Sequence, residues 1–317
     1  MKKIKSLIVG LGNVGLLYDL PGKKTLLSHS LSISKHKSYE LLGGVDKKFK
    51  NRKIFEKFYK KPSFASVKSA LLKLKPKIII VSTPTKTHLK ILKEIMSFKN
   101  IELSSIVMEK PTSFKNLETR EMLKICKRHN IKLFVNYPFV YDSALKIIKK
   151  KIKSQNQKNF ITNITYSKGA YHIASHLIKI CIFFFGKPVK YLNINSINQK
   201  DDFYFNGIIY FKKTKVYFNY SKMINTKIID IILSDCQIII DINSMNVWKR
   251  DKVKKLDQNN FNVLDRKYTQ MKNSQKDIQY FFYEKIKKKI IKSKKIIQNN
   301  YEETFVDNYL ERLKNAK

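Results

Sequence analysis

The first part of the chain alternates short apolar runs with segments of helical spacing. Apolar runs over residues 4–10, 39–46, 77–84, 104–111 and 131–137 predict strands, and continuous stretches such as Ile78–Val81 are typical of strands buried on both faces. Helical spacing follows over residues 64–74, 88–96 and 116–129. Strands that alternate with helices predict a parallel sheet wrapped by helices.

Beyond Tyr141 the pattern changes. A basic helix is expected at residues 144–151, a strand at 160–166 and an apolar helix at 173–185. Period-2 segments then follow at 189–197, 203–211, 216–220, 228–233 and 237–242, and two helices near 276–291 and 302–314 close the chain. Successive strands without helices between them predict a mostly antiparallel open sheet. We therefore expect an α/β protein, with a doubly wound domain at 1–138 and an α+β domain at 139–317.

The first predicted strand ends in a glycine-rich turn, Gly10-Leu11-Gly12-Asn13-Val14-Gly15. In a G-x-G-x-x-G turn the first glycine permits a tight turn, the second lets a pyrophosphate approach the backbone, and the third lets the following helix pack closely. The turn follows a strand and opens a domain of alternating strands and helices. We expect this segment, Asn13 and Val14 included, to bind the phosphates of a dinucleotide.

The second predicted strand ends in Asp46, whose carboxylate is placed to accept hydrogen bonds from a ribose diol and to repel a 2′-phosphate. This favours NAD, although the neighbouring Lys47 and Lys48 leave NADP open. The spacing from Gly15 to Asp46 exceeds the usual distance of about 20 residues. An insertion near residues 18–29 accounts for the difference.

Two further loops lie at predicted strand ends, where open α/β sheets bind ligands. They are Ser82-Thr83-Pro84-Thr85-Lys86-Thr87-His88 and Glu109-Lys110-Pro111. Together with the glycine turn, Asp46 and a later strand ending in Asn136-Tyr137, these motifs closely resemble those of the Gfo/Idh/MocA oxidoreductases. The resemblance extends over essentially the whole chain, and Glu-Lys-Pro at this distance from the glycine turn is its most specific part.

The resemblance implies roles for these loops. Lys110 would bind and polarise the substrate hydroxyl beside the nicotinamide, and Glu109 would lie near the nicotinamide ribose. Thr83, Pro84 and His88 would line the cofactor, and we expect Asn136 at its strand end to contact it as well.

The same resemblance places proton transfer in the second domain. Ser175-His176-Leu177-Ile178, followed by Phe-Phe-Gly186, is similar to the family's catalytic helix, where a histidine at the position of His176 exchanges a proton with substrate. The residue four positions earlier, often Asp in relatives, is His172 here, and this spacing would place both on one helix face. The segment resembles family members associated with surface-polysaccharide synthesis.

Two departures limit what the resemblance implies. His172 cannot supply the fixed negative charge of an Asp, so it is expected to be an accessory that contacts substrate. A metal held by His172 and His176 is an alternative, but no third ligand is evident nearby and no metal is expected. Where many relatives have arginine after Asn136, this chain has Tyr137, which weakens any case for a carboxylate substrate contacted there.

Charge and cysteine content add little to this interpretation. The 65 basic and 24 acidic residues give a net charge of +41, which would ordinarily suggest nucleic acid or an anionic membrane. Almost all the basic residues are lysine, however, whereas arginine binds phosphates better because its planar guanidinium donates two parallel hydrogen bonds. No specific nucleic acid and no membrane partner is therefore expected. Three dispersed cysteines and the early break of the first apolar run at Gly10 predict a soluble, cytoplasmic protein.

The expected reaction is hydride transfer between nicotinamide and a secondary alcohol or ketone of a sugar, cyclitol or sugar nucleotide. An idle NAD(P)-binding regulator and an NAD-assisted glycoside-cleaving or eliminating enzyme are the alternatives. Members of the family that the chain resembles commonly associate through the open face of the C-terminal sheet, so the resemblance implies a homo-oligomer formed through the alternating strands at residues 203–220.

Overall fold

The computed structural model describes residues 3–98, 101–155, 160–199, 202–258, 262–292 and 300–315. The chain divides into two compact units. Unit 1 combines Met1–Pro138 with Lys276–Asn308, and unit 2 combines Phe139–Gln275 with Tyr309–Lys317. Residues 276–308, expected from the sequence to belong to the second domain, therefore group with the first unit.

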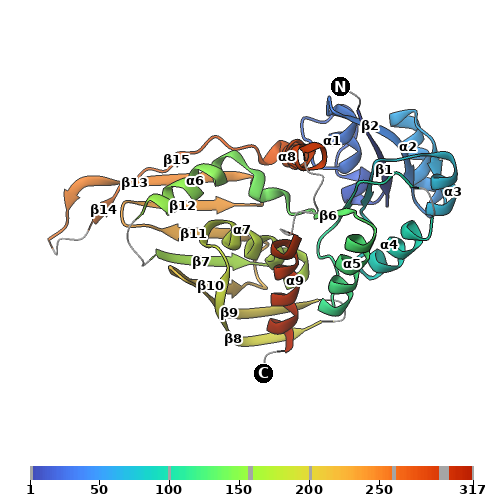
Figure 1. Ribbon diagram of the computed structural model, residues 1–317. Helices are drawn as coiled ribbons and strands as arrows, with labels where there is room; N and C mark the ends of the chain where they lie inside the picture. The colour runs from blue at the N-terminus through green and yellow to red at the C-terminus, as the bar shows by residue number, and fades with distance from the viewer. Residues whose placement is uncertain are drawn as a thin grey trace. The chain divides into compact units, whose positions relative to one another are not determined.

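Unit 1 contains a parallel sheet of six strands in the order β3-β2-β1-β4-β5-β6 (Figure 1). The strands are β1 (Ile4–Val9), β2 (Tyr39–Val45), β3 (Ser63–Phe64), β4 (Ile78–Val81), β5 (Ser105–Met108) and β6 (Lys132–Val135). All of β4 and β5 is buried, as the continuous apolar runs predicted. This is the strand order of a Rossmann sheet, and the order reverses between β1 and β4.

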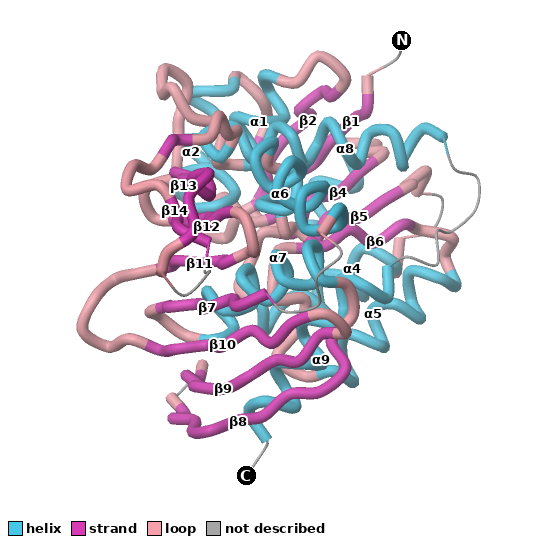
Figure 2. Tube along the Cα trace, turned by 90° about the vertical axis from the view of Figure 1, so that its left-hand side faces the viewer, coloured by secondary structure: helices cyan, strands magenta, loops and turns pink. Residues whose placement is uncertain are grey.

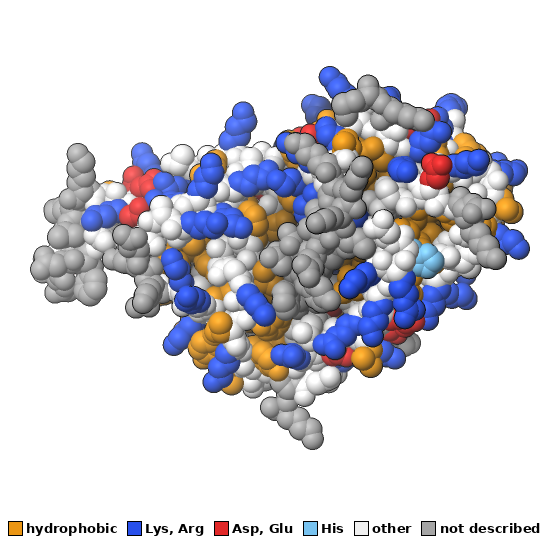
Figure 3. Space-filling model, in the orientation of Figure 1, with side chains coloured by type: hydrophobic (Ala, Val, Ile, Leu, Met, Phe, Trp, Pro, Cys, Tyr) orange, Lys and Arg blue, Asp and Glu red, His pale blue; other side chains and the backbone are white. Residues whose placement is uncertain are grey.

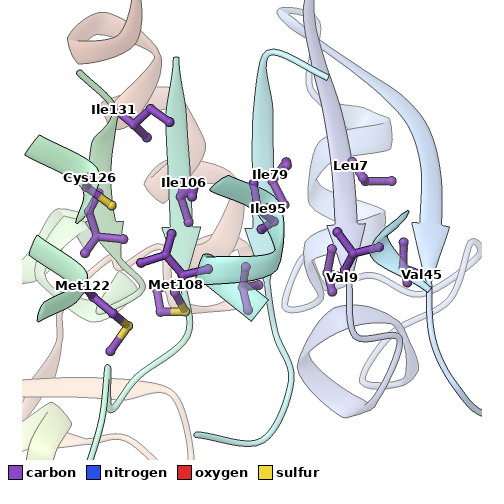
Figure 4. Close-up of a cluster of buried hydrophobic side chains, with 14 of the residues drawn as sticks. Leu7, Val9, Val45, Ile79, Ile95, Ile106, Met108, Met122, Cys126 and Ile131 are labelled. Carbon is purple, nitrogen blue, oxygen red and sulfur yellow. The ribbon is translucent and has the colours of Figure 1, made fainter. Parts of the chain in front are cut away.

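Helices on the two faces of this sheet complete the layers. They are α1 (His29–Lys35), α2 (Phe49–Tyr59), α3 (Val67–Lys73), α4 (His88–Met96), α5 (Asn116–Arg128) and α8 (Ile278–Lys292), and the unit also contains most of α9 (Asn300–Asn315). Figure 4 shows one buried cluster, in which Ile106 and Met108 of β5 face Met122 and Cys126 of α5. Helix α3 begins later than predicted, because Ser66 caps it by accepting from the backbone N–H of Ser69.

The insertion expected from the motif spacing lies between the glycine turn and α1. The turn continues into one short helical turn, Asn13–Leu17, after which an irregular segment with a turn at Leu20–Lys23 leads to α1. The buried carboxylate of Asp19 organises this segment by accepting from the backbone N–H groups of Leu27, at 2.5 Å, and Ser28, at 2.9 Å. The backbone N–H of Leu26 donates to the Lys276 carbonyl oxygen, and the Leu26 carbonyl oxygen accepts from the backbone N–H of Gln279. These two bonds join the start of α8 to the insertion.

Unit 2 contains a sheet of nine strands, β14-β13-β12-β11-β7-β10-β9-β8, with β15 paired to β13 (Figure 2). Its strands are β7 (Phe160–Tyr166), β8 (Pro188–Asn198), β9 (Phe203–Phe211), β10 (Thr214–Tyr220), β11 (Lys227–Ile232), β12 (Cys236–Asp241), β13 (Asn246–Leu256), β14 (Asn262–Leu264) and β15 (Thr269–Gln270). Among the described residues of this sheet, β7 and β10 are the one pair that runs parallel, so the sheet is mostly antiparallel, as predicted.

Strands β13 to β15 were missed by the sequence pattern. Strand β13 carries lysine and arginine at successive positions, so it lacks a clean alternation of polar and apolar residues. Strand β9 alternates fully, and its Phe203, Phe205 and Ile209 are buried. Helices α6 (Ser143–Ser154) and α7 (Ser175–Phe185) lie on one side of this sheet in Figures 1 and 2.

The surface of the described residues carries the excess positive charge. In the view of Figure 3, lysine and arginine side chains are scattered among polar and apolar groups rather than gathered into one patch. Within the same described ranges, no helix combines the length and apolar character that crossing a membrane requires.

Candidate active site

The glycine turn follows β1 at the point where the strand order reverses. Gly10 has a φ of 98°, and a Cβ there would lie 2.5 Å from the Ser82 carbonyl oxygen. A Cβ on Gly15 would lie 2.0 Å from the Gly10 carbonyl oxygen, so neither position accepts a side chain. A Cβ on Gly12, by contrast, would meet nothing within 4 Å. Shape therefore requires two of the glycines, while the third leaves the backbone open to a ligand.

Asp46 follows β2 and is tied to the glycine turn. One carboxylate oxygen accepts from the Leu11 backbone N–H at 2.8 Å, and the other accepts from the Lys48 backbone N–H at 2.7 Å. The guanidinium of Arg52 donates to the Asp46 and Lys47 carbonyl oxygens at 2.9 and 3.0 Å. Asp46 is half-buried, and Lys47 and Lys48 are exposed. The carboxylate is thus fixed in direction, with lone pairs remaining for a further donor.

The loop after β4 is linked to the loop after β5 through His88. Its Nε2 lies 2.9 Å from the Thr83 carbonyl oxygen, and its Nδ1 lies 2.9 Å from the Thr112 carbonyl oxygen. The ring is fully buried, and this burial lowers the pKa of His88, partly opposed by the two carbonyl groups. His88 therefore holds the two loops together. Pro84 is exposed and Thr83 half-buried, while both ring nitrogens of His88 already face the protein's own backbone.

Glu109 follows β5 and is the most constrained acidic group of the site. Its Oε1 accepts from His29 Nε2 at 2.9 Å and from the side-chain amide of Asn136, which follows β6. Burial by itself would raise the pKa of Glu109. The hydrogen bond and positive charge from His29, the amide of Asn136 and the charge of Lys110 outweigh it, and the pKa lies below its ordinary value.

Lys110 is half-buried and precedes a cis peptide bond to Pro111. The loop then continues through Thr112, whose N–H donates to the buried carboxylate of Asp307 in α9 at 3.1 Å. The residues predicted for cofactor binding thus belong to five neighbouring strand ends of one unit. Contacts join Asp46 to the glycine turn, Ser82 to Gly10, and Glu109 to Asn136.

The histidines predicted for proton transfer belong to unit 2. His172 is exposed and lies in a wide helical turn, Ala170–Ala174, that leads into α7. His176 is half-buried near the start of α7, and its ring contacts Phe139 edge-on with centroids 5.1 Å apart. Asp202 accepts from the backbone N–H groups of Tyr171, at 2.8 Å, and His172, at 3.2 Å. A carboxylate from a distant loop thus lies against the turn that carries His172.

Several of these groups escaped sequence reasoning. Within the described ranges no three His, Cys, Asp or Glu side chains gather as a metal site would require. The partners of Glu109 were not found, because His29 is 80 residues away in sequence and no local motif marks it. Asp202 was also not found, because it is 30 residues from His172 in sequence. Its one signal was the absence of an acidic residue beside His176.

Comparisons with known proteins agree with this geometry. Residues 4–137 match the model of an oxidoreductase family with an NAD-binding Rossmann fold. The class is therefore that of the NAD(P)-binding Rossmann oxidoreductases. The N-terminal domain, residues 4–137, therefore belongs to the Gfo/Idh/MocA family. No curated protein matches the chain.

Solved structures of the same fold cover almost the whole chain. One assigned as an NADPH-dependent oxidoreductase from Desulfitobacterium hafniense has a TM-score of 0.78 at 12% identity, covering 99% of this chain and 95% of that one. The UDP-N-acetylglucosamine 3-dehydrogenase GnnA from Acidithiobacillus ferrooxidans has a TM-score of 0.72 at 11% identity, covering 99% and 97%. The WlbA dehydrogenase from Chromobacterium violaceum, in complex with NADH and UDP-GlcNAcA, has a TM-score of 0.72 at 13% identity, covering 99% and 93%.

Proposed function

We propose that the protein transfers a hydride between the nicotinamide of NAD and a secondary alcohol or ketone of a sugar, cyclitol or sugar nucleotide. The observation that carries the proposal is the arrangement around Glu109. This buried carboxylate is held by His29 and Asn136 beside Lys110, one strand away from the loop that contacts the glycine turn. A dinucleotide and a lysine that polarises a hydroxyl need such an arrangement.

The residues present fit the cofactor. The open space at Gly12 and the free N–H groups at the start of the Asn13–Leu17 turn suit a pyrophosphate, and Asp46 suits a ribose diol. We propose that Thr83, Pro84, Glu109 and Asn136 complete this binding site. Nicotinamide supplies the hydride acceptor or donor when bound. NAD is preferred to NADP, because the Asp46 carboxylate would repel a 2′-phosphate.

We assign the proton chemistry to Lys110 and His176. The ammonium of Lys110 orients the substrate oxygen and stabilises negative charge that develops on it. His176 takes or returns the hydroxyl proton, since an imidazole exchanges protons readily near neutral pH. His172 is the accessory that contacts substrate. A sugar nucleotide is supported by the ligands named for relatives of the same fold, UDP-GlcNAcA among them.

Unit 2 would bind the substrate and also a second copy of the chain. Strand β8 at the sheet edge exposes Val189, Ile194 and Ile197, each by 60% or more, and such a face suits self-association. The cytoplasm is the proposed location, because Cys126, Cys181 and Cys236 are all buried free thiols.

A thermal-shift screen of sugar nucleotides, with and without NAD and NADP, tests the proposal. NAD should raise the melting temperature, and the substrate should raise it further only when the cofactor is present. Gly12→Ala should fold normally but lose the stabilisation by NAD. The added methyl group meets nothing in the protein, yet it occupies the space proposed for the pyrophosphate. A wild-type protein that neither dinucleotide stabilises, or a Gly12→Ala variant that binds NAD normally, would refute the proposal.

A further inference from the structure

Buried polar groups continue from Glu109 into two helices. His29, the first residue of α1, is fully buried between the sheet end and α8. Its Nε2 lies 2.9 Å from Glu109 Oε1, and its Nδ1 lies 2.6 Å from the hydroxyl of Tyr283 and 3.2 Å from the amide of Gln279. Both of the latter residues are also buried. A hydroxyl, an imidazole and a carboxylate thus form one continuous chain.

The hydrogen-bond partners of His29 fix the direction of its ring. The Glu109 carboxylate accepts, so Nε2 of the imidazole carries a proton. The Tyr283 hydroxyl and the Gln279 amide both lie within hydrogen-bonding distance of Nδ1. Gln279 and Asn136 also pair with each other through both amide atoms, at 3.0 and 3.2 Å. Every member of the network therefore orients another member, and all of them converge on Glu109.

We propose that His29, Tyr283 and Gln279 are positioning residues of the active site, which hold the Glu109 carboxylate ionised and correctly oriented beside Lys110. This rests on the proposed function, in which Glu109 and Asn136 bind the cofactor. The two α8 residues are four positions apart, so they lie on the same face of one helix. Helix α8 is itself fastened by the Leu26 backbone bonds, so the C-terminal part of the chain sets the charge of a site built from the N-terminal part.

A second histidine provides a matched control. His36, which ends α1, is buried, and its Nε2 lies 3.0 Å from Glu284 of α8. Its ring stacks on Tyr280, with centroids 4.5 Å apart. This pair joins the same two helices as His29 does, without contacting Glu109. A role that is only structural should therefore appear in both histidines, whereas a positioning role should appear in His29 alone.

The experiment measures the titration of Glu109 directly, by carbon-13 NMR of its carboxylate, with the signal assigned by its loss in Glu109→Gln. In His29→Ala the pKa of Glu109 should rise, because the group stays buried while it loses its donor. His29→Gln, whose amide can donate toward the same oxygen, should restore the wild-type titration. Tyr283→Phe should shift the pKa in the same direction by less, and it offers a milder change if His29→Ala folds poorly. His36→Ala should leave the titration unchanged.

NADH binding provides the second readout. As the pH is lowered from about 8 to about 5.5, the affinity of His29→Ala for NADH should fall by about tenfold more than the affinity of wild type does. This is the scale of one charged hydrogen bond. Besides Glu109, the ionisable groups that face this site are Tyr18, His29, His88, Lys110 and Tyr283. Because His29→Ala removes one of them, the same comparison is made with Tyr283→Phe, which keeps His29, and with His36→Ala, which keeps them all.

An unchanged Glu109 titration in both His29→Ala and Tyr283→Phe would overturn the proposal, as would an equal shift in His36→Ala. If wild-type protein binds neither NADH nor NADPH, the proposed function fails instead. The carboxylate titration would still decide the network in that case, because it requires no cofactor.

Discussion

Asp307 of α9 should make the folded protein less stable as the pH rises from about 4 to about 7. Its carboxyl group is buried, and it accepts from the backbone N–H of Thr112 in the Lys110 loop. Burial raises the pKa of Asp307 from 3.8 to about 7, although hydrogen bonds from Thr112 and Thr119 partly oppose the rise. The folded chain therefore binds this proton more tightly than the unfolded chain does.

The size of the effect follows from that difference. A pKa raised on folding stabilises the protein fully below the unfolded value, and the benefit is lost as the pH rises toward the folded value. The difference, 7 minus 3.8, is about 3 units, and each unit corresponds to about 1.4 kcal/mol. Asp307→Asn, which cannot ionise, should therefore gain about 4 kcal/mol relative to wild type between about pH 4 and about pH 8.

Urea unfolding followed by circular dichroism across this pH range measures the gain. Replacing the carboxyl group with an amide also changes the free energy of unfolding by an amount that does not vary with pH. The informative quantity is therefore how the difference in unfolding free energy between variant and wild type changes with pH. Asp265→Asn, at an exposed position, should show no such change. Parallel stability profiles for wild type and Asp307→Asn would show that the carboxyl is not held protonated.

The remaining predictions concern catalysis and cofactor choice. Lys110→Met should lower kcat by about 100-fold or more with NAD affinity nearly intact, the scale of losing one electrostatic stabiliser, and near-normal turnover would remove Lys110 from the mechanism. His176→Ala should lower kcat by about 100- to 10,000-fold, and His172→Ala by less; steady-state kinetics with the larger loss in His172→Ala would reverse their roles. Calorimetry should show tighter binding of NAD than of NADP, with the gap narrowed in Asp46→Ala, and equal wild-type affinities would contradict this.

Buried strands were the part of the fold most readily predicted from sequence. Ile78–Val81 is apolar at every position because both of its faces are covered, and this pattern identifies a parallel sheet directly. Helix α2 was not predicted, because the apolar residues of Phe49–Tyr59 do not mark one buried face: Phe49 and Phe58 are exposed, and Phe55 alone among them is buried. Strand β3 is two residues long, and its pairing with β2 comes from the sheet rather than from any local pattern.

The residues of the candidate site also differ in whether the sequence could reveal them. Gly10 and Gly15 stand in a glycine turn that local sequence singled out, whereas Glu109 and Asn136 were singled out because their motifs resemble those of a known family. His29 and Tyr283, separated by 254 residues, meet only because α8 packs with unit 1. Neither residue stands in a local pattern that distinguishes it from an ordinary core side chain. Groups that act through tertiary contacts are visible only once the chain is folded.

The fastening of α8 to the N-terminal sheet has a consequence for biosynthesis. A ribosome releases residues 1–138 long before Gln279 and Tyr283, so the nascent Rossmann sheet must wait for the helix that completes it. Until then His29 and Asn136 keep their bonds to Glu109 but lack their partners from α8, and each buried polar group left unpaired costs about 1–3 kcal/mol. Domains usually fold in the order of their synthesis. Here the first unit finishes only after residues 139–275 of the second have emerged, so a nascent chain arrested before α8 should be a target for chaperones.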